Sequence, residues 1–260
     1  MLLQKQTQLR KDTTMEFFNN FFTSNVGQNN FSSFGNIHII LLLIALVGSI
    51  YIIINKKENR AFELIIAGVL ILQQASLYFW YFGSNYNILQ EGLPLYHCRI
   101  SILFVGLGIL FNNSKLIKIG SYWGIFGSTM ALLFPSIDPF AFPHITQFSF
   151  FIGHIFLLWG CIYILFVKNI GMSTVDLKTI LVFTNVYHIL MFMLNSNLMS
   201  NYGYMNHPPI SILNVLNPYV YSICVIITFN LIIITEYILI NKKTITGKSS
   251  SNTLSNILNA

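Results

Sequence analysis

Residues 37–54 read IHIILLLIALVGSIYIII, an uncharged apolar run with a histidine near its start, and Asn55-Lys56-Lys57 follow it. A helix needs about 20 apolar residues to cross the hydrocarbon core of a bilayer, which is about 30 Å thick. The chain is 54% hydrophobic and 8% charged, whereas soluble domains are about 25% charged. The sequence therefore predicts an all-α membrane protein, a bundle of seven transmembrane helices. The expected spans are Ile37–Ile54, Ala61–Phe82, Leu95–Phe111, Ile119–Phe134, Ile145–Val167, Thr179–Leu194 and Pro218–Ile240.

Basic residues lie in every second gap between these spans, and the intervening gaps contain no Lys or Arg. Because basic loops stay on the cytoplasmic side, we expect the N-terminus outside and the C-terminus inside a multi-pass protein of the cell membrane. The domain organisation that follows is an extracellular tail over residues 1–36, a transmembrane domain over 37–240 and a disordered cytoplasmic tail over 241–260. The composition changes from polar in residues 1–14 to rich in Phe and Asn from residue 15 onward, so we expect Met15 to be the true first residue of the protein.

The basic gaps also account for the net charge of +6, so this charge does not indicate nucleic-acid binding. Membrane lipids are the expected partners, and the oligomeric state is left open. The six histidines all lie in the non-basic gaps or in the halves of the spans next to them: His38, His97, His144, His154, His188 and His207. Any chemistry is therefore expected on the outer side. No two histidines have the i, i+4 spacing of metal ligands on one helix, so we expect neither a metal nor a cofactor.

A polar cluster, Tyr96-His97-Cys98-Arg99, opens the third span. Ionisable groups inside a span usually face the interior of the bundle. A guanidinium and an imidazole near a thiol favour the thiolate, which is the nucleophilic form. Neighbouring residues of a helix point in different directions, so the base for Cys98 is expected from another helix.

His154 is the best candidate for that base. Cys98 is fourteen residues from Asn112, and His154 is fourteen residues from Lys168. At 1.5 Å per residue, both lie about 21 Å above the cytoplasmic boundary. Gln73 and His188 lie at similar heights, so these polar groups predict a pocket in the outer half of the membrane. Cys161 and Cys224 are expected to be packing residues.

Several of these residues also resemble a known family, the bacterial YwaF-type integral membrane proteins, which are similar to eukaryotic transmembrane acyltransferases that remodel ether phospholipids. The resemblance is carried by Met15-Glu16-Phe17-Phe18, His38, Leu93-Pro94-Leu95 with Cys98, Ile100-Ser101, His154, and Asn201-Tyr202 before Pro208-Pro209. It implies a Cys98 nucleophile, a His154 base and a thioester intermediate. It further implies that Arg99, Asn201 and Tyr202 hold a headgroup or an oxyanion. The family often has a histidine two residues before the cysteine, where this chain has Tyr96.

Two functions from different classes remain open on the sequence. The first is a Cys/His-dependent lipid acyltransferase or acyl hydrolase, in which His97, Arg99, Gln73, His188, Asn201 and Tyr202 surround the catalytic pair. The second is a non-enzymatic protein that binds or transports a small solute through the same pocket. A structural subunit is the third interpretation. Against the enzyme stands the absence of an obvious carboxylate to orient the histidine.

Overall fold

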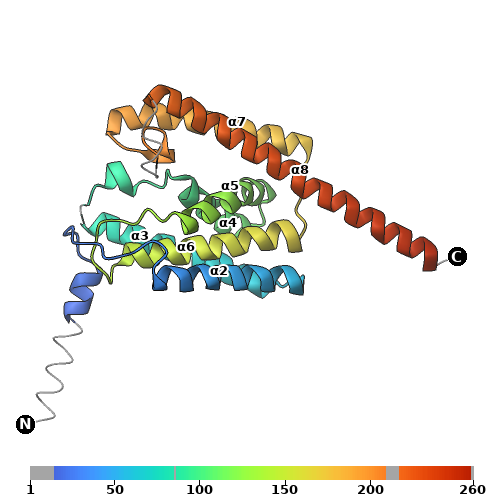
Figure 1. Cartoon of the computed structure of the whole chain (residues 1–260), viewed down its shortest axis with the longest axis horizontal. Helices are drawn as coiled ribbons and strands as arrows, with labels where there is room; N and C mark the ends of the chain where they lie inside the picture. The colour runs from blue at the N-terminus through green and yellow to red at the C-terminus, as the bar shows by residue number, and fades with distance from the viewer. Residues whose placement is uncertain (1–14, 85, 209–216, 259–260) are drawn as a thin grey trace, which may run out of the picture.

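The computed structural model describes residues 15–84, 86–208 and 217–258, and every regular element in them is helical (Figure 1). The long helices are α2 (Asn36–Asn55), α3 (Arg60–Ser84), α4 (His97–Leu110), α5 (Ser114–Leu133), α6 (Ile145–Ile162), α7 (Thr174–Leu198) and α8 (Pro218–Leu258). Two π-helical turns, η1 (Ile88–Gly92) and η2 (Tyr163–Val167), and one 3₁₀ turn, η3 (Tyr202–Tyr204), lie between them. Residues 15–21 form a further short helix.

Within this described part of the chain, six helices are long and apolar enough to cross a membrane. The predicted third span is not among these six, because the structure has only the 14-residue helix α4 at this position. At 1.5 Å per residue α4 is about 21 Å long, which is short of a hydrocarbon core about 30 Å thick. The chain is extended at Leu93, because the residue before a proline disfavours helical backbone, and it is extended again at Tyr96, with φ −72° and ψ 141°. The helix therefore begins at His97 and not at the predicted Leu95.

The ends of two other helices also differ from the expected spans. α7 begins at Thr174, five residues before the predicted start, because Ser173 and Asp176 form a reciprocal capping box that satisfies the first free N–H groups. α8 continues to Leu258, through the segment 241–258 for which composition predicts disorder. Extending an existing helix adds one hydrogen bond per residue without a new nucleation step.

The helices form two groups (Figure 1). α2 to α6 lie side by side, and one apolar core joins α3, α4, α5 and α6 around Leu70, Val105 and Leu157. α7 and α8 pack on each other along one side of this group. A second core, which includes Trp123, Tyr187 and Ile233, attaches them to α5.

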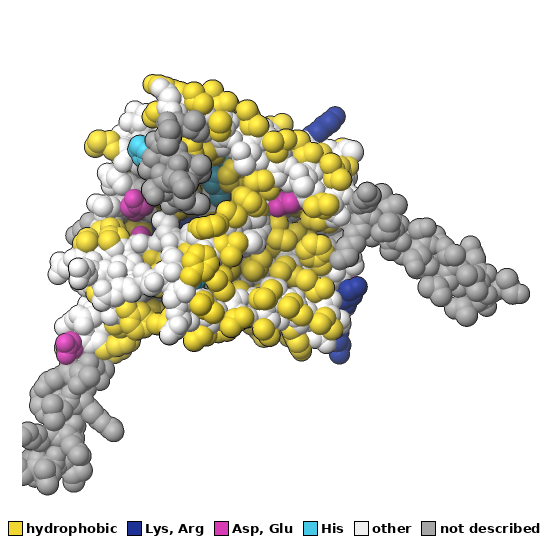
Figure 2. Space-filling view, viewed as in Figure 1, with side chains coloured by type: hydrophobic (Ala, Val, Ile, Leu, Met, Phe, Trp, Pro, Cys, Tyr) yellow, Lys and Arg dark blue, Asp and Glu magenta, His cyan; other side chains and the backbone are white. Residues whose placement is uncertain are grey.

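The two ends of the bundle have different chemistry. The basic end contains a buried ion cluster, in which the Glu63 carboxylate lies 2.7 Å from Arg60 Nη1 and 2.8 Å from Lys168 Nζ. The opposite end, which we call the pocket end, carries the connections 86–96, 134–144 and 199–207. Figure 2 shows Lys and Arg side chains at one end of the visible face, and hydrophobic side chains over most of the surface between the ends.

An N-terminal strap, residues 22–35, crosses the pocket end and is fixed to the connection 134–144. Gly27 N–H donates to the Pro139 carbonyl (3.0 Å), and the Asn29 side-chain amide donates to the Asp138 carbonyl (3.2 Å). His38 is fully buried, and its imidazole joins the strap to α5: Nδ1 accepts from Phe34 N–H (2.8 Å), so Nε2–H donates to the Leu132 carbonyl (2.7 Å). Residues 22–35 of the predicted tail 1–36 are therefore packed against the pocket end of the bundle.

Candidate functional site

A cavity of about 600 Å³ lies at the pocket end. Helices α3, α4, α5, α6 and α8 and the connections at this end all contribute to its wall. Its polar lining includes Gln73, His97, Cys98, Arg99, Asp138, Ser149, His154 and Asn201. The short α4 explains the position of three of these, because its first turn begins inside the bundle.

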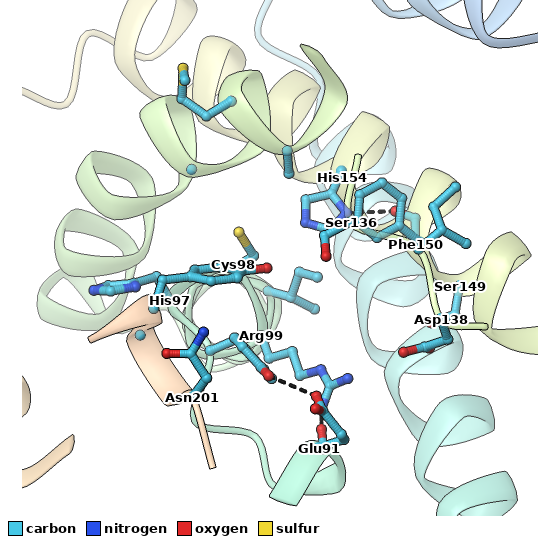
Figure 3. Close-up of a pocket in the computed structure, with 18 of the residues that line it drawn as sticks. Glu91, His97, Cys98, Arg99, Ser136, Asp138, Ser149, Phe150, His154 and Asn201 are labelled. Atoms are coloured by element: carbon cyan, nitrogen blue, oxygen red, sulfur yellow. Dashed lines mark hydrogen bonds between the residues drawn. The ribbon is translucent and has the colours of Figure 1, made fainter. Parts of the chain in front are cut away.

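Cys98 and His154 lie on opposite walls of this cavity. Figure 3 shows the Cys98 sulfur and the His154 ring pointing into the same open space, from α4 and α6. On the far side of the sulfur is Gly127 of α5, where an added Cβ would lie 3.3 Å from Sγ. The thiol is thus free toward the cavity and closely packed toward α5.

The orientation of His154 is fixed by its own helix. Its Nδ1 lies 2.6 Å from the Phe150 carbonyl oxygen, one turn earlier in α6. A carbonyl only accepts, so Nδ1 carries the ring proton and Nε2 keeps its lone pair. A backbone carbonyl thereby orients the ring, as a carboxylate does in other sites, and Nε2 is left able to accept a proton.

Cys98 occupies the first turn of α4, after the extended residue Tyr96. The backbone N–H groups of a first helical turn have no partner within the helix. Together with the helix dipole they favour negative charge at this point. The first turn of α4 can therefore stabilise a thiolate or an anionic intermediate formed at Cys98.

Arg99 extends from the same turn toward the pocket end, beside the catalytic candidates (Figure 3). Its guanidinium donates to the carbonyls of Glu91 and Leu93 and to the Tyr81 hydroxyl. Its carbon Cζ also lies 5.1 Å from the centre of the Tyr96 ring. Among the described residues no carboxylate lies within ion-pair distance of Arg99. An anionic group entering the cavity would be its first charged partner.

Asp138 lines the same part of the cavity from the connection after α5. Burial, reinforced by the negative charge of Glu91, raises the pKa of the Asp138 carboxyl, while Arg99 and Thr146 act in the opposite direction. The net shift is upward, because the loss of water outweighs the attraction of a guanidinium that already has other partners.

Other residues predicted from the sequence have structural partners. His97 Nε2 lies 3.0 Å from His188 Nε2, and His188 is fully buried behind the cavity wall. Gln73 lines the cavity and is hydrogen-bonded to Ser149 (2.5 Å) and Gln74 (3.1 Å). These groups contribute to the polar wall of the cavity or support it.

Asn201 and Tyr202 fix the connections at the pocket end through hydrogen bonds. The Asn201 side chain donates to the carbonyl of His207 and accepts from its N–H. Tyr202 is fully buried, and its hydroxyl donates to the Leu89 carbonyl and accepts from Leu93 N–H. Asn201 lines the cavity, whereas Tyr202 holds the segment that leads into α4. Pro209, part of the resemblance noted from the sequence, lies outside the described residues.

Sequence reasoning missed the apolar side of the cavity. Its members on α5 and the residue that caps it, and those on α8, recur at i, i+4 and i+8: Phe126, Met130 and Phe134, and Tyr221, Val225 and Phe229. This spacing was available in the sequence, but any buried helix face has the same periodicity.

In the described part of the chain, no three His, Cys, Asp or Glu side chains are grouped so that they could hold a metal ion. The family model of the TMEM164 family matches residues 31–238, which is most of the chain. No curated protein and no solved structure matches the chain.

Proposed function

Since the chain belongs to the TMEM164 family, we propose that this membrane protein is a Cys98/His154-dependent acyltransferase or acyl hydrolase that acts on membrane lipids. The observation that carries the proposal is the hydrogen bond from His154 Nδ1 to the Phe150 carbonyl, in a cavity that also contains Cys98. The YwaF-type sequence resemblance supports the same assignment. So does the position of Cys98 in the first turn of α4.

The topology is part of the proposal. The alternation of basic gaps supports a protein of the cell membrane with the N-terminus outside, the C-terminus inside and the pocket end facing outward. In this arrangement α4 is the third of seven crossings, and its short length leaves Cys98 below the membrane surface.

The proposed reaction begins with proton transfer from the Cys98 thiol to His154 Nε2. The thiolate attacks the ester carbonyl of a donor lipid, the C–S bond forms, and the C–O bond to the lysolipid breaks. His154 returns its proton to the departing alkoxide. In the second half, a lysolipid hydroxyl or water gives its proton to His154 and attacks the thioester, which breaks the C–S bond. His154 then returns this proton to the departing Cys98 thiolate, which restores the thiol.

Arg99 supplies a binding site for the anionic part of the donor. Its guanidinium borders the same cavity as the thiol, and its hydrogen-bond partners among the described residues are all neutral. A planar guanidinium matches two phosphate oxygens. His97, Gln73 and Asn201 contribute to the polar wall around this group.

The test is to trap the acyl-enzyme. The purified protein in lipid nanodiscs receives phosphatidylcholine with a radiolabelled acyl chain, and the hydroxylamine-sensitive label on the protein is measured. We expect label on Cys98, and we expect Cys98→Ser and His154→Ala to abolish it. Cys224→Ser is the matched control, because Cys224 is exposed on α8. Absence of a thioester, together with saturable binding of a lipid or solute, would favour the non-enzymatic alternative.

A further inference from the structure

α5 and α8 face each other across the cavity with matching apolar stripes. Phe126, Met130 and Phe134 form one wall, and Tyr221, Val225 and Phe229 form the other. We call the space between them the α5–α8 slot. The first and last residues of each stripe are eight positions apart, so at 1.5 Å per residue the slot is about 12 Å long.

The slot ends at the level of the reactive thiol. The rings of Phe126 and Phe229 meet edge to face at its inner end, with their centres 6.2 Å apart. Phe229 also stacks on His97, with ring centres 4.2 Å apart. Gly127 follows Phe126 and lies against Cys98 Sγ. The thiol therefore opens onto the floor of an apolar slot.

The polar lining is concentrated elsewhere in the cavity. Glu91, Arg99 and Asp138 lie together toward the pocket end (Figure 3). α5 and α8 are both of membrane-spanning length, so the slot lies at the depth of lipid chains. Figure 2 shows the surface hollowed between the α7–α8 pair and the rest of the bundle.

From this division we propose that the α5–α8 slot binds a hydrocarbon chain of a membrane lipid, the chain attached to the ester that reacts at Cys98. At this depth an apolar space is filled by lipid tails, which are as apolar as its walls. The choice of a lipid as occupant rests on the proposed function. The slot determines which chains are accepted, with Met130 and Val225 on its facing walls.

Photocrosslinking tests the slot without requiring turnover. The protein is placed in phosphatidylcholine nanodiscs that contain a trace of phosphatidylcholine with a diazirine in its sn-2 chain, and labelled residues are mapped by mass spectrometry. We expect label on Phe126 and Met130, and we expect Val225→Trp to remove the label from Met130 by filling the slot from the opposite helix. Ile227→Trp is the matched control, because Ile227 is 54% exposed on the outer side of α8.

Label confined to the outward faces of the helices would overturn the slot, and so would Met130 label that persists in Val225→Trp. If Val225→Trp does not fold, the positions of the crosslinks in the wild-type protein decide the proposal alone. Crosslinks in the slot without an acyl-enzyme would reject the enzymatic proposal and keep the chain site. An acyl-enzyme without crosslinks in the slot would keep the enzymatic proposal and reject the chain site.

Discussion

Replacing Gly127 by alanine should separate stability from activity. Gly127 lies inside α5, where alanine is favoured over glycine by about 0.5–1 kcal/mol. The added Cβ would lie 3.3 Å from Cys98 Sγ, whereas ordinary contacts are 3.4–4 Å. Relief requires a shift of a few tenths of an ångström, and the sulfur at the end of a short side chain is the atom most able to move.

That movement displaces the sulfur of Cys98, the proposed nucleophile, from its position opposite His154. A misplacement of about 1 Å can lower a rate about 100-fold, so a shift of a few tenths should lower it by roughly 3- to 10-fold. We therefore expect Gly127→Ala to raise the thermal unfolding midpoint slightly and to slow acyl-enzyme formation in a single-turnover assay.

Gly68→Ala is the matched control. Gly68 also lies inside a long helix, α3, and a Cβ there meets nothing within 4 Å. It should gain the same helix stability and keep the wild-type rate. A wild-type rate for folded Gly127→Ala would refute the reasoning, because the sulfur beside Gly127 would then not be the reactive group.

Three further changes probe the framework of the site. His38→Ala removes two buried hydrogen bonds, to Phe34 and Leu132, and should lower stability by about 3 kcal/mol, or the unfolding midpoint by about 6–12 °C; an unchanged midpoint would contradict those bonds. Glu63→Gln weakens the ion cluster at the basic end and should lower stability by about 1.5–3 kcal/mol, as for hydrogen bonds to charged groups, less so in 1 M salt; a salt-independent loss would point to packing instead. The raised pKa of the Asp138 carboxyl means that its ionisation opposes folding, so stability falls as pH rises above about 3.8 through the folded pKa. Asp138→Asn should remove this fall, and midpoints measured at pH 4 and pH 7 should then show a stabilisation confined to the higher pH.

The membrane-length helices could be predicted from the sequence because hydropathy alone determines them. The exception, α4, begins only after the extended residue Tyr96, and a hydropathy count does not register backbone conformation. The early start of α7 was readable in Ser173 and Asp176, three residues apart as in a capping box.

Part of the candidate site was also accessible from the sequence. Counting residues from the basic gaps placed Cys98 and His154 at one depth, and both line one cavity. The count gave no rotation about the helix axes, so it could not show that α8 faces α5. It also could not show that the His154 ring is oriented by the Phe150 carbonyl, because every residue has a carbonyl group and the sequence does not show which one accepts a given hydrogen bond.

The N-terminal strap bears on how the protein is made. Its bond from Asn29 to the Asp138 carbonyl joins residues 109 positions apart, and the bond from His144 to the Thr23 carbonyl joins residues 121 apart. Pairings between residues this far apart in the chain form late. During synthesis the strap emerges long before its partners, so it can be fixed at the pocket end only after the start of α6 has left the ribosome. A nascent chain halted earlier would present an uncapped bundle to the quality-control machinery of the membrane.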